Sequence, residues 1–143
     1  AQLRDQGVRI HTFGISTPPA IYAFERMGIY SFDSLGWVRS GGYGKVFLPF
    51  TRAYNVSQRS TKNGALSEEE FAYLKHLTGH HCAFCASFST LRDHRLYRIL
   101  HNLFCIMDTI SEQRTLGKGE IINLIAERSG RYYRTFKELY YSD

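Results

Sequence analysis

All three cysteines of the chain lie beside histidines in one part of the sequence. The segment His80–Cys85 reads HHCAFC, and a second segment, His101–Cys105, reads HNLFC. A Cys-x-x-Cys turn offers two thiolates from one tight loop, and a histidine on a following helix adds an imidazole, as tetrahedral zinc sites require. The pattern therefore predicts a Zn²⁺ site that includes Cys82, Cys85 and His101.

The fourth ligand is left open by spacing alone. His80 and His81 both precede the cysteine turn, and Cys105 lies one helical turn beyond His101 on the same face. Two other interpretations compete with zinc. The cysteines could be buried thiols beside solvated histidines, or they could form a thioredoxin-like redox pair. The redox interpretation is the weaker one, because no predicted strand precedes this Cys-x-x-Cys and it does not open a βαβ unit.

Composition limits the class of protein. The chain has 143 residues, of which 43% are hydrophobic, enough for one ordinary domain and too few for two. It has no apolar run long enough to span a membrane, and its N-terminus lacks a signal-peptide pattern, so we expect a cytoplasmic protein without a membrane contact. Three cysteines cannot all pair within one chain, so the Cys-x-x-Cys indicates metal or redox chemistry in place of a structural disulfide. A net charge of +5 suits a polyanionic partner such as nucleic acid.

The first third of the chain predicts a βαβ unit. Val8–Gly14 alternates apolar and polar residues as a half-buried strand does. Thr17 is a helix N-cap followed by proline, and Gly28 is suited to the left-handed C-cap of that helix. A second strand is predicted over Ile29–Ser34. Because a helix joins the two strands, they should pair in parallel.

The remaining two thirds predict a loop followed by helices. Glycines at four positions indicate a tightly turned or mobile loop over residues 36–44, before an extended segment. A helix should start at Ser67, which forms a capping box with Glu70, and should stop at Gly79. A longer helix is predicted over about residues 90–115, from apolar residues at helical spacing. Two shorter helices should follow, over residues 120–128 and 131–141.

The run Thr12–Phe47, TFGISTPPAIYAFERMGIYSFDSLGWVRSGGYGKVF, resembles the last barrel repeat of the tRNA-guanine transglycosylases. A glycine-rich strand end, a Thr-Pro helix start, a Phe-Asp strand end and an Arg-Ser-Gly-x-x-Gly loop follow in that family's order. The family's zinc ligands form Cys-x-Cys-x-x-Cys, followed downstream by His-Asn-Leu. Here His80-x-Cys82-x-x-Cys85 and His101-Asn102-Leu103 occupy those places, and the resemblance extends from Val8 to about Met107.

Two departures from the family pattern refine the resemblance. The first ligand position holds histidine in place of cysteine, and the interval from Cys85 to His101 is shorter than in the tRNA enzymes. Both changes point towards the divergent DNA 7-deazaguanine transglycosylases. Because the family's first ligand stands two residues before Cys82, the resemblance implies that His80 completes the zinc site, in place of His81 or Cys105.

The resemblance also implies a fold. It predicts an α/β protein, the C-terminal portion of a (β/α)8 TIM barrel with a zinc-binding helical subdomain. Residues 1–50 would be the last βαβ units, 51–66 a basic connection, 67–105 the zinc-binding segment, and 106–143 C-terminal helices that pack on the barrel. A complete barrel has eight βα units. We therefore expect a C-terminal part of a larger enzyme, with the general acid and the base-recognition groups upstream and no turnover by this chain alone.

The chemistry implied by the resemblance is base exchange. Asp33 would attack C1′ of the target nucleotide and form a covalent ester, which lets guanine in DNA, the favoured polymer, or in tRNA be replaced by a 7-deazaguanine base. Phe13 and Gly14 would bind the base. Arg39 would hold the nucleic-acid backbone, and Lys45 is our own addition. The alternative is a noncatalytic zinc-stabilised nucleic-acid-binding module, in which Asp33 merely caps a strand. The sequence leaves open whether the protein forms a homodimer.

Overall fold

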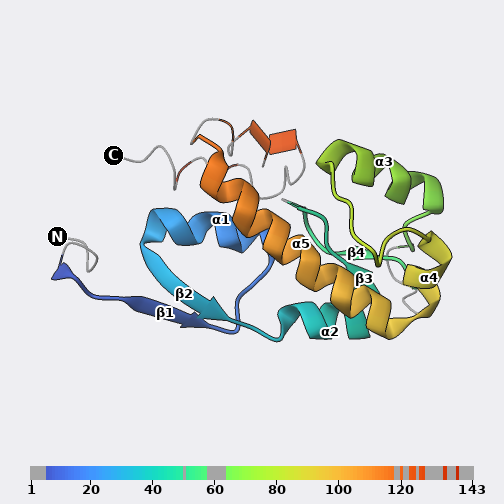
Figure 1. Ribbon diagram of the computed structural model, residues 1–143, viewed down its shortest axis with the longest axis horizontal. Helices are drawn as coiled ribbons and strands as arrows, with labels where there is room; N and C mark the ends of the chain where they lie inside the picture. Colours follow the sequence, from blue (N-terminus) through green and yellow to red (C-terminus); the bar gives the residue numbers. More distant parts are fainter. Residues whose placement is uncertain are drawn as a thin grey trace.

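The computed structural model describes residues 6–49, 51–57 and 64–117, together with isolated residues between 120 and 138. Figure 1 shows a small parallel sheet at one end of the molecule, a group of helices at the other, and one long helix that runs between them. The two helices predicted over residues 120–128 and 131–141 lie mostly outside the described residues.

The N-terminal part is a βαβ unit. Its elements are β1 (Ile10–Phe13), α1 (Pro18–Met27) and β2 (Ile29–Asp33). The two strands pair in parallel, as predicted, with His11 opposite Ser31 and Phe13 opposite Asp33. One face of the sheet packs on α1, where the rings of Phe24 and Phe32 lie 5.1 Å apart.

The glycine-rich segment after β2 forms the helix α2 (Gly36–Gly42), so the predicted loop is wrong there. The reason is tertiary packing on the long helix α5 (Arg95–Thr115). A Cβ atom placed on Gly41 would lie only 2.8 Å from the backbone nitrogen of Ile99. The glycine that suggests a loop in the sequence thus permits a close contact between two helices.

A short extended segment separates two parts of the core. β3 (Lys45–Val46) pairs antiparallel with β4 (Tyr54–Asn55). Side chains alternate along the chain from β3. Val46 and Leu48 belong to a cluster with residues of the α3–α4 region, whereas Phe47 packs with residues of α1 and α5. The backbone of Phe47 therefore lies between the two clusters.

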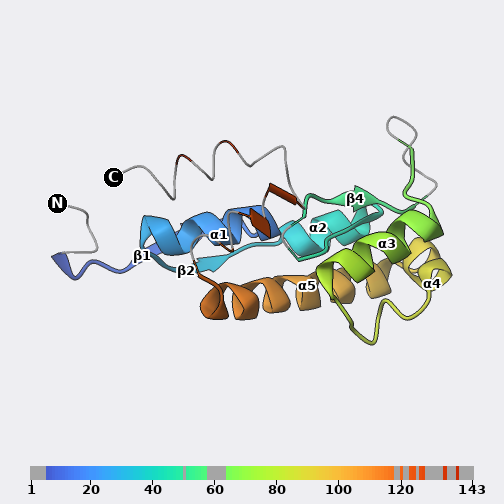
Figure 2. The same cartoon turned by 90° about the horizontal axis from the view of Figure 1, so that it is seen from above.

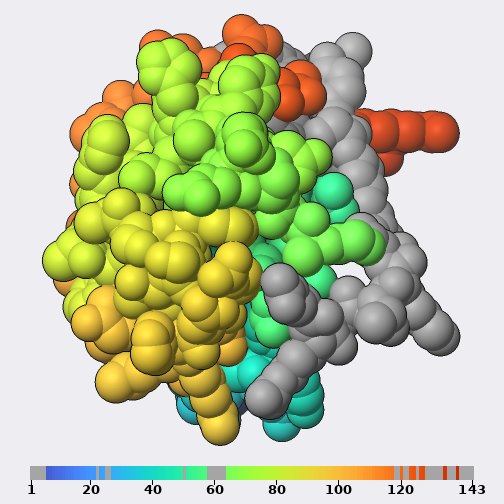
Figure 3. Space-filling model, turned by 90° about the vertical axis from the view of Figure 1, so that its right-hand side faces the viewer, coloured from blue at the N-terminus to red at the C-terminus, as the bar shows by residue number. Residues whose placement is uncertain are grey.

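The second half of the chain contains helices. α3 (Glu68–Thr78) starts with the predicted capping box and ends at Gly79, which has a left-handed φ of 63°. Figures 2 and 3 show α3 beside α4 (Phe88–Asp93) and the start of α5. The helix predicted over about residues 90–115 is confirmed from Arg95 to Thr115, but its predicted start is wrong, because His94 is extended and divides α4 from α5. α5 continues without a break past residue 105, the predicted segment boundary. In the described part of the chain, no helix has the length and apolar character needed to cross a membrane.

Candidate metal centre

The four residues predicted as zinc ligands lie together. The donor atoms of His80, Cys82, Cys85 and His101 all lie within 4.8 Å of one another, so the group could hold a metal ion. The first three come from the loop between α3 and α4, and the fourth comes from α5. The left-handed turn at Gly79 leads directly into this loop. All the cysteines are free thiols.

His80 is oriented by a carboxylate. Its ring is buried, with 2% of the residue exposed, and its Nδ1 lies 2.6 Å from Oδ2 of Asp108 on α5. Because an ionised carboxylate can only accept, Nδ1 carries the proton and donates it. Nε2 is then the nitrogen that has a lone pair for a metal. This carboxylate–histidine arrangement is common behind metal ligands, where it fixes both tautomer and ring orientation.

His101 is oriented by a backbone carbonyl. Its Nε2 lies 2.8 Å from the oxygen of Phe47, and its Nδ1 lies 3.4 Å from Sγ of Cys82. A carbonyl oxygen only accepts, so Nε2 donates and Nδ1 faces the cluster with its lone pair. The carbonyl that fixes His101 belongs to the segment between the two core clusters, far away in sequence.

The next residue, Asn102, fixes the same segment. Its Oδ1 accepts from the backbone N–H of Phe47 at 2.8 Å, and its Nδ2 donates to the carbonyls of Trp37 and Lys45. The amide is fully buried, and all three of its bonds reach backbone more than fifty residues away. Successive residues of α5 therefore position the metal group and the strand beside it.

Without a metal ion, the donor side chains hydrogen-bond to one another and shift one another's pKa values. A hydrogen bond with Cys82 holds the pKa of Cys85 far below its ordinary value, and the same bond raises the pKa of Cys82. Burial lowers the pKa of His80, but hydrogen bonds with Cys85 and Asp108 outweigh it and raise that pKa. A bound cation takes the place of these shared protons, so binding would release them.

The two other candidates for the fourth ligand are outside the group. His81 is exposed. Cys105 is fully buried, and burial raises the pKa of its thiol. Its Sγ lies 3.4 Å from Nε2 of His80 and of His101, and it donates to the carbonyl of Phe47. Cys105 therefore contacts the outer nitrogen of His101 and the metal-facing nitrogen of His80, and its protonated thiol is a neutral neighbour of the cluster.

Three of the predicted base-exchange residues, Phe13, Gly14 and Asp33, lie at the ends of β1 and β2, at the other end of the molecule (Figure 1). Phe13 and Asp33 are opposite each other at the carboxyl ends of β1 and β2, and both are exposed. Gly14, at a φ of 78°, donates its N–H to the carbonyl of Asp33 at 2.9 Å. Arg39 and Lys45 are exposed on α2 and β3. The structure thus places Phe13, Gly14 and Asp33 together and the two cations on separate elements.

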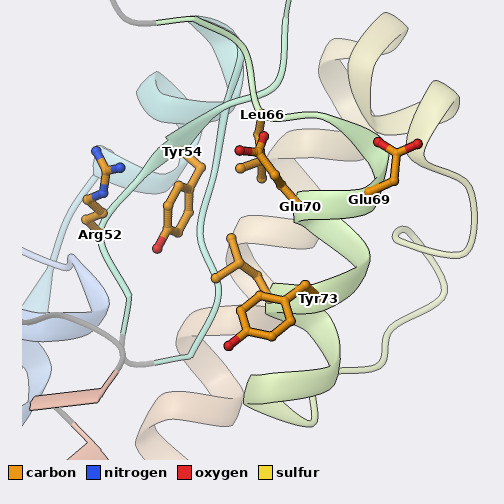
Figure 4. Close-up of a pocket in the computed structure, with 7 residues that line it drawn as sticks. Arg52, Tyr54, Leu66, Glu69, Glu70 and Tyr73 are labelled. Carbon is orange, nitrogen blue, oxygen red and sulfur yellow. The ribbon is translucent and has the colours of Figure 1, made fainter.

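A pocket of about 480 Å³ lies between β4 and α3 (Figure 4). It is lined by Arg52, Tyr54, Leu66, Glu69, Glu70, Tyr73 and Leu74. The guanidinium of Arg52 lies over the ring of Tyr54, 4.8 Å from its centroid. The sequence suggested a basic connection here, but it gave no signal that α3 would close one side of a pocket.

Sequence reasoning also missed the groups behind the ligands. Asp108 has a weak signal, since it lies seven residues after His101 and therefore on the same side of α5. The Phe47 carbonyl has no signal at all, because any residue type offers one. Comparisons with protein-family models, curated proteins and solved structures gave no match. The His/Cys cluster is the functional feature that the structure itself supplies.

Proposed function

We propose that the cluster binds one Zn²⁺ and that the site is structural. Two thiolates and two imidazoles are a donor set that zinc favours, and four protein ligands fill its usual tetrahedron. Three of the four residues are buried, and both imidazoles are oriented by hydrogen-bond acceptors. Such a site holds the loop between α3 and α4 against α5, and its metal has no open position for a substrate.

We further propose that the opposite end belongs to a transglycosylase that exchanges guanine in a nucleic acid, DNA in preference to tRNA, for a 7-deazaguanine base. The observation that carries this proposal is the position of Asp33, an exposed carboxylate at the carboxyl end of a parallel strand, opposite the exposed ring of Phe13. Ligands of parallel α/β folds bind at that end of the strands. A ring there can stack on a base, and a carboxylate there can attack a sugar carbon.

The proposed reaction has two displacements at C1′ of the target nucleotide. A carboxylate oxygen of Asp33 forms a bond to C1′ while the bond from C1′ to N9 of guanine breaks, and the base leaves with that electron pair. The incoming 7-deazaguanine base then bonds to C1′, and Asp33 departs as a carboxylate. The leaving base takes up one proton at its ring nitrogen, and the incoming base releases one, so the exchange is balanced.

The exposure of the β1–β2 sheet is an argument that this end belongs to a larger barrel. Within the described residues, the sheet that carries Asp33 has two strands, and only one of its faces packs on helices. Parallel sheets are normally covered on both faces, and a two-stranded sheet is marginal by itself. Both facts favour further parallel strands beside β1 and β2, as in the C-terminal portion of a (β/α)8 barrel.

The test is Asp33→Asn in the full-length protein that contains this chain. The substitution keeps size and removes the nucleophile, so base exchange and any covalent adduct with a guanine-containing DNA should both disappear, while the melting temperature stays unchanged. Adduct should be assayed with tRNA in parallel, which distinguishes the two polymers. Near-normal exchange by Asp33→Asn would overturn the assignment. Nucleic-acid binding without any adduct in the unmodified protein would favour the noncatalytic zinc-stabilised module.

A further inference from the structure

Four side chains project from the open face of the β1–β2 sheet. They are His11, Phe13, Ser31 and Asp33, and the strand register places His11 opposite Ser31 and Phe13 opposite Asp33. We propose that His11, held by Ser31, is a positioning residue for the carboxylate of Asp33. This role rests on the proposed base exchange.

The imidazole of His11 is held on two sides. Its Nδ1 lies 2.8 Å from Oγ of Ser31, within hydrogen-bond distance. The ring of Phe13 meets it edge to face, with 4.5 Å between centroids. On the remaining side, Nε2 of His11 lies 3.9 Å from Oδ2 of Asp33. The ring therefore has one nitrogen anchored and the other directed at the carboxylate.

This arrangement can fix the Asp33 rotamer. If the hydroxyl of Ser31 donates to Nδ1, the imidazole proton lies on Nε2 and points at Oδ2 of Asp33. The Asp33 side chain is 64% exposed, so little else restrains it. The 3.9 Å separation is longer than a hydrogen bond, so the exposed carboxylate must rotate towards Nε2 to accept from it. Once it does, Oδ1 is free to attack C1′ along a defined direction. Orientation of that kind accounts for a large part of enzymatic rate enhancement.

The same contact serves both displacements without moving a proton. When Oδ1 bonds to C1′, Oδ2 becomes the carbonyl oxygen of the ester, which can accept from Nε2 as the carboxylate did. When the incoming base breaks the Oδ1–C1′ bond, the electron pair returns to the carboxylate, and Nε2–H stabilises the restored charge. His11 lies on the nucleophile's side of the sugar, away from the leaving base, so it is not placed to protonate that base.

The test uses the full-length protein and a guanine-containing DNA oligonucleotide. It measures two quantities, the single-turnover rate of covalent adduct formation and the Kd for the oligonucleotide. His11→Phe keeps a ring and removes the donor, and it should slow adduct formation roughly 10- to 100-fold with Kd unchanged. His11→Gln places an amide donor near the position of Nε2 and should recover most of the rate. His76→Phe, which alters an exposed histidine on α3, is the matched control and should behave like the unmodified protein.

A double-mutant cycle separates positioning from a general effect on the sheet. Ser31→Ala should slow adduct formation alone but have no further effect in the His11→Phe background, because Ser31 acts through His11. Equal rates for His11→Phe and the unmodified protein would overturn this role and leave the base exchange standing, as would additive effects of the two substitutions. Absence of adduct in the unmodified protein would overturn the base exchange and this role together.

Discussion

The metal end and the sheet end of the molecule are built in opposite ways. At the metal end, each histidine donor is buried and bonded to a group far away in sequence, Asp108 for His80 and Phe47 for His101. At the sheet end, Phe13 is 75% exposed, and the side chain of Asp33 faces solvent from an open sheet. The chain thus brings its candidate metal ligands together by itself, whereas the face for which base exchange is proposed lies open to solvent.

The largest effect that we predict separates the two ends by removing the metal. Chelation, or Cys85→Ser, should lower the free energy of unfolding of the metal end by more than about 4 kcal/mol, because metal binding there is coupled to folding. Hydrogen exchange should show lost protection in α3, in α4 and in the loop between them. Exchange in β1 and β2 should change little. Equal loss of protection at both ends would contradict a metal site that stabilises the α3–α4 region alone.

A second substitution should weaken the link between the ends. Asn102→Ala removes the buried amide and leaves the N–H of Phe47 and the carbonyls of Trp37 and Lys45 without these partners. We expect a loss of about 2–4 kcal/mol in chemical denaturation. Ser111→Ala, at an exposed position of the same helix, is the control. A loss below about 1 kcal/mol, the contribution of about one hydrogen bond, would show that the hydrogen bonds of Asn102 do not stabilise segment 45–47.

A third change tests the carboxylate behind the metal ligand. Asp108→Asn should reduce zinc affinity by roughly 10- to 100-fold in competition with a chromogenic chelator, since the amide orients His80 less strongly. The fold should persist when zinc is in excess. Asp93→Asn makes the same chemical change at an exposed residue that pairs with Arg92, and it should leave zinc affinity unaltered. Equal zinc affinities for the two variants would show that Asp108 does not orient His80 for metal binding.

The sequence predicted what is local in this fold. The capping box of Ser67 and Glu70, the stop at Gly79 and the parallel pairing of β1 with β2 are all confirmed. Each depends on residues close to one another in sequence or on the handedness of one βαβ unit. Cys82, Cys85 and His101 could also be predicted as ligands, because the two cysteines share one turn and few helical histidines follow it in the sequence.

What the sequence could not predict depends on contacts between distant segments. α2 is helical because Gly41 fits against Ile99. The break at His94 has a similar origin, since Arg98 donates to the carbonyls of Gly41, Leu91 and Arg92 at 2.8 Å. This single buried side chain satisfies backbone groups of α2 and α4 at once. Neither the contact of Gly41 with Ile99 nor the hydrogen bonds of Arg98 can be predicted from hydrophobic periodicity, because periodicity describes each helix separately.

The smallest effect concerns nucleic-acid binding by Arg39, on α2. Arg39→Gln in the full-length protein should reduce the slope of log K against log salt by about one, the value expected for one lost phosphate contact. Arg92→Gln, at the metal end, should leave the slope unchanged. Equal slopes for the Arg39 variant and the unmodified protein would mean that Arg39 is only solvated.

Metal analysis of the purified chain tests whether it binds one zinc ion through His80, Cys82, Cys85 and His101. We expect one zinc per chain, loss of that zinc in His80→Ala, and retention in Cys105→Ser. Loss of zinc in Cys105→Ser with retention in His80→Ala would contradict the ligand set. A chain purified in the presence of zinc that holds no metal would contradict the site itself.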